Sequence, residues 1–291
     1  MHRNYKTMFV IAGLGLLLQG CSLNRLLLNS ASGFFEGGLS VLYEEDDLDI
    51  AEKFLANNLK MLEMLLSKDP QNQRLSLMAA QGFGAYAMAF VEDESPRRAG
   101  RLYLRGFNYA LNALPPKLRF DAKITPDDLE QKLAEMQVKQ VPALFWIGYN
   151  WGQYILQHLE DPRVLVNLAK VEFIMRRVLE LDENYNFAGV HLFYGSFYAA
   201  RPPILGGNPE RGREHFERCL ALNQGQLMMA NVYFAKYYAV QVLDKELFDR
   251  LLNEVLELDI DRYPQFRLMN SLAKRKAELL KTKAEIYWVE E

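Results

Sequence analysis

The sequence predicts an all-α fold in which antiparallel helix pairs stack into a compact superhelical solenoid. Apolar residues recur at the three- and four-residue spacing of a buried helix face along the chain beyond Asp47. No stretch alternates apolar and polar residues between hairpin turn pairs, as the strands of a half-buried sheet would. Helix endings of similar form also return along the chain, which is typical of repeats.

Composition and charge exclude several classes of protein. The chain has 291 residues, of which 50% are hydrophobic and 12% aromatic, so a sizeable core is expected and general disorder is excluded. The net charge is −3, without the basic excess that nucleic-acid-binding proteins use. Two cysteines cannot build a disulfide framework. We therefore expect a folded body that does not bind nucleic acid.

The N-terminal segment has the pattern of a targeting signal. Basic residues precede an apolar run over residues 8–18, which is shorter than the roughly 20 residues of a membrane span. Residues 18–21 (Leu-Gln-Gly-Cys) look like a bacterial lipobox, in which the cysteine sulfur is alkylated by a diacylglycerol before cleavage. The prediction is a lipoprotein signal peptide over residues 1–20 and lipidation at Cys21.

This interpretation places the protein in the periplasm. Several acyl chains make a stable anchor, and Ser22 after the modified cysteine favours the inner leaflet of the outer membrane. Residues 21–46 then form the lipidated N-terminus and a tether, and residues 47–291 form the helical domain. Two alternatives remain open: a secretory signal whose cysteine is incidental, and an uncleaved membrane anchor.

The hydrophobic pattern predicts the position of each helix along the chain. The acidic run 44–47 precedes the first amphipathic stretch, residues 48–66, and suits the positive end of a helix dipole. Four leucines of that stretch share one face: Leu55, Leu59, Leu62 and Leu66. Similar patterns predict helices over residues 73–91, 96–113, 127–137, 140–158, 162–181, 187–200, 208–222, 226–242, 244–258 and 264–286.

The helix endings and the pattern inside one unit indicate tetratricopeptide-like (TPR) repeats. Endings at Asp182, Asn223 and Asp259 lie 41 and 36 residues apart, close to the roughly 34-residue period of these repeats. In these repeats, small residues let the two helices of a pair cross closely, and a large ring fills the gap to the next pair. One pair has this pattern, with Gly195 and Tyr198 on the first helix and Gly212, Phe216 and Cys219 on the second. On this register Phe216 fills the seam between two pairs, and Cys219 is a buried apolar residue without reactivity.

The most distinctive stretch of the chain, residues 194–217, resembles the T-component lipoproteins of tripartite ATP-independent periplasmic (TRAP) transporters. The shared features are a lipidated cysteine, divergent helix pairs, and a Gly-Gly turn before a helix with a His/Tyr-Phe-Glu pattern. The positions on this motif are Gly195, Pro203, Gly206, Gly207, Glu214, Phe216 and Glu217. Gly212 stands where the family commonly has alanine.

The resemblance implies a transport accessory with a helical repeat body. It also implies a homotrimer, docking to the solute-binding P-component of a TRAP system, and a channel that holds an apolar or organic-acid ligand. The motif residues are structural rather than catalytic. An alternative is a structural lipoprotein scaffold for an envelope protein complex, with no small-molecule ligand.

The Gly206-Gly207 turn has a structural interpretation and a functional one. Two glycines permit positive φ, Asn208 can cap the next helix, and Pro209 suits its first turn. In the functional alternative, residues 201–204 border the mouth of a ligand channel, where the Arg201 guanidinium holds a carboxylate.

Aromatic residues are denser on the later helices than one core face requires. Such rings can line an apolar pocket, or they can serve ordinary packing between repeats. The candidate ligand-channel residues are Arg201, Tyr194, Phe197, Tyr198, Tyr233 and Tyr237.

No catalytic constellation is present in the sequence. The four histidines lie far apart without a His-Glu-x-x-His pair for zinc, and no Gly-x-Ser-x-Gly elbow occurs. We therefore expect no enzyme, no cofactor and no metal site. The basic run 274–276, together with Lys281 and Lys283, is interpreted as a solvated helix face, with anionic lipid or partner contact as the alternative.

Overall fold

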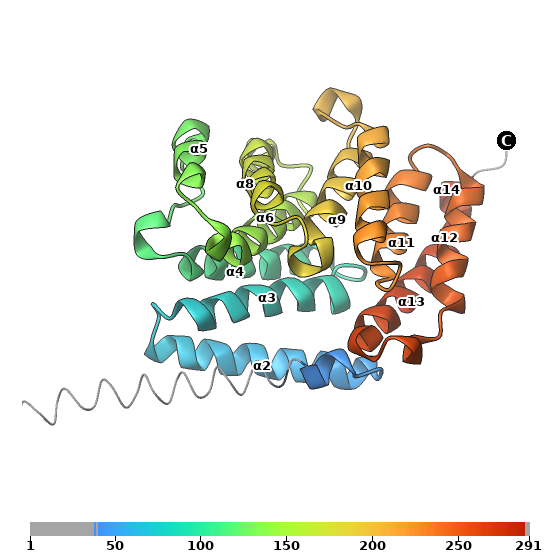
Figure 1. Cartoon of the computed structure of the whole chain (residues 1–291), viewed down its shortest axis with the longest axis horizontal. Helices are drawn as coiled ribbons and strands as arrows, with labels where there is room; N and C mark the ends of the chain where they lie inside the picture. The colour runs from blue at the N-terminus through green and yellow to red at the C-terminus, as the bar shows by residue number, and fades with distance from the viewer. Residues whose placement is uncertain (1–37, 39, 289–291) are drawn as a thin grey trace, which may run out of the picture. The chain divides into compact units, whose positions relative to one another are not determined.

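The computed structural model describes residue 38 and residues 40–288, and every regular element in that part of the chain is a helix (Figure 1). This confirms the all-α prediction. The signal peptide over residues 1–20 and the lipidation at Cys21 lie outside the described residues. Residues Tyr43–Glu291 form one compact unit, and the elements below belong to it.

The helices are short to medium in length and are joined by brief turns. The α-helices are α2 (Leu48–Lys68), α3 (Gln73–Phe90), α4 (Pro96–Ala113), α5 (Pro126–Ala134), α6 (Val141–Leu156), α7 (Pro162–Leu165), α8 (Leu168–Leu181), α9 (Tyr185–Ala199), α10 (Pro209–Leu222), α11 (Met229–Tyr233), α12 (Lys245–Glu257), α13 (Arg267–Thr282) and α14 (Ala284–Tyr287). The 3₁₀ turns are η1 (Pro116–Leu118), η2 (Val138–Gln140), η3 (Pro203–Leu205), η5 (Ile260–Arg262) and η6 (Pro264–Phe266), and η4 (Phe234–Ala239) is a π-helix.

Consecutive helices pack against each other in pairs. Helix α3 packs on α4, α6 on α8, α9 on α10, and η4 on α12, and α4 also packs on α6 (Figure 1). Helix α2 buries the four predicted leucines, and the Asp47 carboxylate caps its start by accepting hydrogen bonds from the amides of Asp49 and Ile50. Helix α13 contacts α2, α11 and α12, so the last long helix returns to the first.

The Gly206-Gly207 turn has the backbone geometry and the helix cap that the structural interpretation predicts. Gly206 adopts the left-handed conformation with φ 79°, which glycine accepts without strain. A Cβ atom on Gly207 would lie 1.8 Å from the carbonyl oxygen of Arg201, so no other residue fits. The Asn208 side chain then caps α10 by accepting a hydrogen bond from the Arg211 amide.

Several predicted helices differ from the structure, and the helix predicted over residues 264–286 is divided into η6, α13 and α14. The helix predicted over residues 162–181 is interrupted, because the Asn167 side chain donates to the Val164 carbonyl and competes with the helical backbone. The helix predicted over residues 226–242 is also wrong in its interior. There α11 passes into the π-helix, in which the Val240 amide donates to the Ala235 carbonyl five residues earlier.

The start of α9 contains an unusual left-handed turn. Asn186, Phe187 and Ala188 have φ between 51° and 57°, so the right-handed helix that the sequence predicts from residue 187 begins only after this turn. Left-handed backbone costs about 1–2 kcal/mol per residue other than glycine. Tertiary contacts offset this cost, since Asn223 donates to the Phe187 carbonyl at 2.7 Å and the Phe187 ring packs on Phe266.

Candidate functional site

An interior cluster of tyrosine, lysine and carboxylate side chains lies beside the π-helix. Its members are Glu92 and Asp93 after α3, Tyr103 on α4, Tyr149 on α6, Tyr233 on α11, Lys236 and Tyr237 on η4, and Lys276 on α13. The Tyr103 hydroxyl donates to Glu92 at 2.6 Å. The Lys276 ammonium donates to Glu92 at 3.0 Å and to Asp93 at 2.5 Å. Residues from five helices and from the turn after α3 therefore meet around one polar core.

Three phenols of this cluster, those of Tyr103, Tyr149 and Tyr233, are neutral hydrogen-bond donors. Burial raises the pKa of Tyr103, Tyr149 and Tyr233, and the negative charge of Glu92 raises each of them further. A tyrosine that stays protonated can donate to a carboxylate, whether that carboxylate belongs to the protein or to a ligand.

In the part of the chain that the structure describes, Lys236 has no ion pair of its own, unlike Lys276 in the same cluster. The Coulombic interaction with the Tyr237 side chain, together with the charges of Glu92 and Asp93, raises the pKa of Lys236 against the opposing effect of burial. Its ammonium also lies 5.1 Å from the centroid of the Tyr237 ring. Among the described residues the two carboxylates are instead paired with Lys276, so Lys236 is a charged donor that lacks a direct carboxylate partner.

The predicted channel residues of α9 form a second group. The Tyr194 and Tyr198 rings stack at 5.5 Å, and their hydroxyls donate to the backbone carbonyl and the carboxylate of Glu172. Arg201 places its guanidinium 3.4 Å from the centroid of the Phe197 ring. It donates to the carbonyl of Phe197 at 2.7 Å and to that of Gly206 at 3.2 Å. Arg201 thus closes the Gly-Gly turn.

The structure therefore divides the predicted ligand residues into two sets. Tyr194, Phe197, Tyr198 and Arg201 lie together on α9 and its following turn, whereas Tyr233 and Tyr237 belong to the cluster beside the π-helix. Their assignment to one ligand channel stays a prediction.

The interpretation of the basic run as a solvated face is wrong for Lys276, whereas Arg275 is exposed and Lys274 is half-buried. Lys276 is only 4% exposed, Lys274 donates to the Leu256 carbonyl at 2.8 Å, and Arg275 donates to the Ala89 carbonyl. A signal was present in the sequence, because Lys276 falls midway between Leu272 and Leu280 at four-residue spacing, on the buried face of α13.

Sequence reasoning also missed a histidine pair. His191 on α9 and His215 on α10 are far apart in sequence, yet their Nδ1 atoms lie 2.9 Å apart. Burial lowers the pKa of both imidazoles, that of His215 to about 4 with help from His191 and Arg211. Both rings are therefore neutral at neutral pH.

Cys219 has the buried, unreactive character predicted for it. It is 1% exposed, and burial raises the pKa of its thiol to about 12, so the thiolate needed for nucleophilic chemistry is not formed at neutral pH.

Within residues 38 and 40–288, no group of three or more His, Cys, Asp or Glu side chains is arranged to hold one metal ion. In the same part of the chain no helix has both the length and the apolar character of a membrane span.

A family comparison decides the class of this protein. The model of the TRAP transporter T-component family matches residues 44–288, which is most of the chain. The chain belongs to this family. T-components are accessories of TRAP transport and not enzymes, and the resemblance predicted from residues 194–217 is confirmed. An uncharacterized protein of Treponema pallidum (strain Nichols) is 28% identical over 309 aligned residues, which cover 94% of this chain and 95% of the relative.

Proposed function

We propose that this T-component is a lipid-anchored periplasmic protein of the outer membrane that docks the solute-binding P-component of its TRAP system. Membership of the family supports the transport role, and the lipobox-like sequence ending at Cys21 supports the anchor. Cys21→Ser is expected to abolish the acyl mass shift and release the protein from membranes. Unchanged detergent partitioning of this variant would exclude the anchor.

We further propose that the helix pairs are TPR-like repeats and that the protein assembles as a homotrimer. The pairwise packing of consecutive helices supports the repeats, as does the close contact at one crossing, where a Cβ on Gly212 would lie 2.9 Å from the Ala199 Cβ. Light scattering on the purified protein tests the trimer, and pull-down with the P-component of the same system tests docking.

The single observation that carries a ligand role is Lys236 in its tyrosine-rich surroundings. A carboxylate that leaves water needs a charged donor to offset its lost hydration. Lys236 supplies that charge beside neutral phenol donors, without an ion pair of its own among the described residues. An organic acid with an apolar body fits this combination of one cation, hydroxyl donors and aromatic rings.

The ligand role is tested by comparing matched lysine variants. Lys236→Met is expected to weaken binding of organic acids at least tenfold, as measured by calorimetry with a panel of small carboxylates. Lys245→Met is the control, since Lys245 is an exposed partner of Asp249 on α12. Arg201→Ala separates the two sets of predicted residues. Loss of binding only in this variant would move the site to α9.

The scaffold alternative is favoured by the local engagement of Arg201 with Phe197 and Gly206. If the protein binds none of the carboxylates and carries no small molecule when purified natively, we conclude that it acts as a scaffold.

A further inference from the structure

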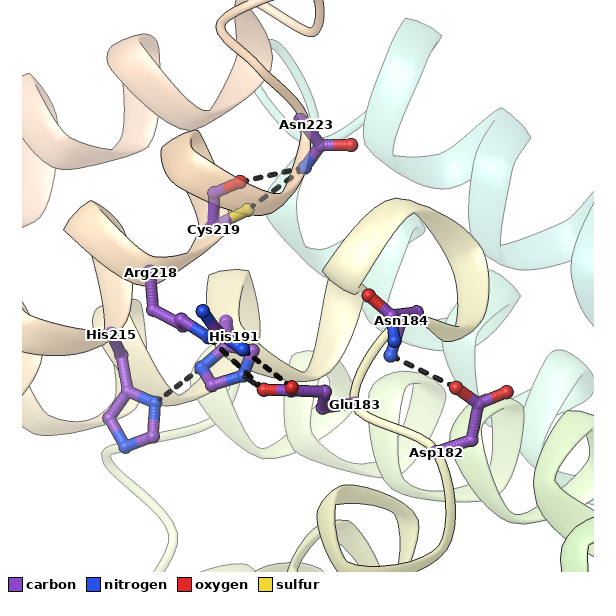
Figure 2. A network of polar contacts seen from close by, with 8 residues as sticks. All are labelled: Asp182, Glu183, Asn184, His191, His215, Arg218, Cys219 and Asn223. Carbon is purple, nitrogen blue, oxygen red and sulfur yellow. Dashed lines mark hydrogen bonds and ion pairs between the residues drawn. The ribbon is translucent and has the colours of Figure 1, made fainter.

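His191 on α9 and His215 on α10 face each other, and a carboxylate and an arginine beside them orient the His191 ring (Figure 2). The Nδ1 atoms of His191 and His215 face each other at 2.9 Å. On the other side of the His191 ring, Nε2 lies 3.1 Å from a carboxylate oxygen of Glu183. Arg218 holds that carboxylate with two donors, Nη2 at 2.6 Å and Nε at 3.2 Å.

The carboxylate determines where the protons lie. An ionised carboxylate only accepts hydrogen bonds, so His191 carries its proton on Nε2 and presents the lone pair of Nδ1 toward His215. His215 then donates from its own Nδ1 and keeps a lone pair on Nε2. If the proton of neutral His215 moves from Nδ1 to Nε2, both Nδ1 lone pairs face one point, with no net change in charge.

We propose that His191 and His215 together bind a first-row transition-metal ion, Zn²⁺, Ni²⁺ or Cu²⁺, through their Nδ1 atoms. Imidazole nitrogen is a preferred ligand of all three ions. Two nitrogens that each lie about 2.0–2.1 Å from a tetrahedral ion are about 3.3 Å apart, so the rings need to separate by only a few tenths of an ångström. This site is distinct from the cluster around Lys236 and from the proposed transport role.

The surrounding side chains support coordination. A metal-bound histidine typically donates its other ring nitrogen to a carboxylate, and Glu183 already occupies that position. The Tyr194 and Tyr198 rings stack on His215 with centroids 5.0 and 5.9 Å away, which fixes its plane. Arg218 holds Glu183 in place in turn.

The number and charge of the ligands define which ions bind. No third His, Cys, Asp or Glu joins the pair among the described residues, so water completes the coordination. Arg211, whose guanidinium lies over the Tyr198 ring, adds positive charge nearby. Hard ions such as Mg²⁺, which prefer oxygen ligands and several carboxylates, are therefore expected not to bind.

Calorimetry on the purified full chain tests the site with the chlorides of zinc, nickel, copper and magnesium. We expect binding of the first three ions and none of Mg²⁺. His215→Ala should abolish this binding. The control is His158→Ala, which should leave the binding unchanged, because His158 lies just after α6 and contacts the Tyr154 carbonyl instead. Glu183→Gln should weaken it about 10–100-fold, the usual effect of losing a carboxylate that orients a ligand.

A second measurement does not depend on folding of a variant. In the Cu²⁺-loaded unaltered protein, electron paramagnetic resonance should resolve coupling to two imidazole nitrogens. Coupling to one imidazole or none, or equal affinity in the unaltered protein and His215→Ala, would overturn the proposal.

Discussion

At the scale of single residues, the buried ring of Phe216 connects neighbouring helices. Phe216 is fully buried, stacks on Phe234 at 5.0 Å, and lies so close to α9 that a Cβ on Gly195 would approach its ring at 2.7 Å. One side chain thus contacts the helices on both sides of α10.

Phe216→Ala is expected to lower the free energy of unfolding by about 3–5 kcal/mol, because removing a buried ring leaves a cavity between helices. Chemical denaturation of the purified protein measures this. Phe54→Ala is the control, since Phe54 is 40% exposed on α2. If both variants lose the same stability, Phe216 does not join the helix pairs as described.

Leu243→Gly is expected to raise the free energy of unfolding by up to about 1 kcal/mol. Leu243 has φ 57° and its side chain is 73% exposed, so the left-handed backbone is strained and little packing is lost on truncation. Leu243→Ala keeps the strain and should change the melting temperature little. A Gly variant no more stable than the Ala variant would contradict this reasoning.

At the scale of elements, helix bounds could be predicted where local sequence signals mark both ends of a helix. Helix α4 begins and ends at the predicted residues, because Pro96 suits a first turn and small residues define its buried face. The π-helix could not be predicted. One extra residue in a turn rotates the following side chains by about 100°, and the sequence around Lys236 carries no mark of it. The histidine pair was hidden for another reason, since it depends on how α9 lies against α10.

Helices α2 and α4 are joined by an ionic contact that gives a pH dependence. Glu63 accepts hydrogen bonds from Lys60, Arg105 and Tyr109. Burial raises the pKa of Glu63, but these donors outweigh it and hold the pKa below its ordinary value. Because the folded-state pKa is lowered, the stabilisation is complete above the unfolded-state pKa and is lost as pH falls through the folded-state pKa.

Glu63→Gln should therefore cost stability at neutral pH, by about 1 kcal/mol at most since Arg105 is partly exposed. The difference from the unaltered protein should disappear once acidification takes the pH below the lowered folded-state pKa of Glu63. Urea unfolding at several pH values measures it. A difference that stays constant with pH would show that the carboxylate charge has no role.

At the scale of the whole molecule, Lys276 joins the end of the chain to its first half. Its ammonium forms ion pairs with both Glu92 and Asp93, 184 and 183 residues earlier in the sequence. Lys276→Ala is expected to lower the free energy of unfolding by about 3–5 kcal/mol, because it leaves two carboxylates without their cation. Lys281→Ala, at a half-buried position of the same helix where the ammonium donates to Asn253, is the control. Equal melting temperatures of the two variants would contradict this.

The position of Lys276 also has a consequence for the order in which the chain folds. Domains generally begin to fold from their N-terminal part during synthesis, yet here α3 and α4 remain without their counter-charge until α13 has been made. During synthesis the turn between α3 and α4 therefore carries two carboxylates that lack their lysine partner. Contacts between residues so distant in sequence also form slowly. We expect the N-terminal half to stay loosely packed, and open to proteases, until nearly the entire polypeptide is available.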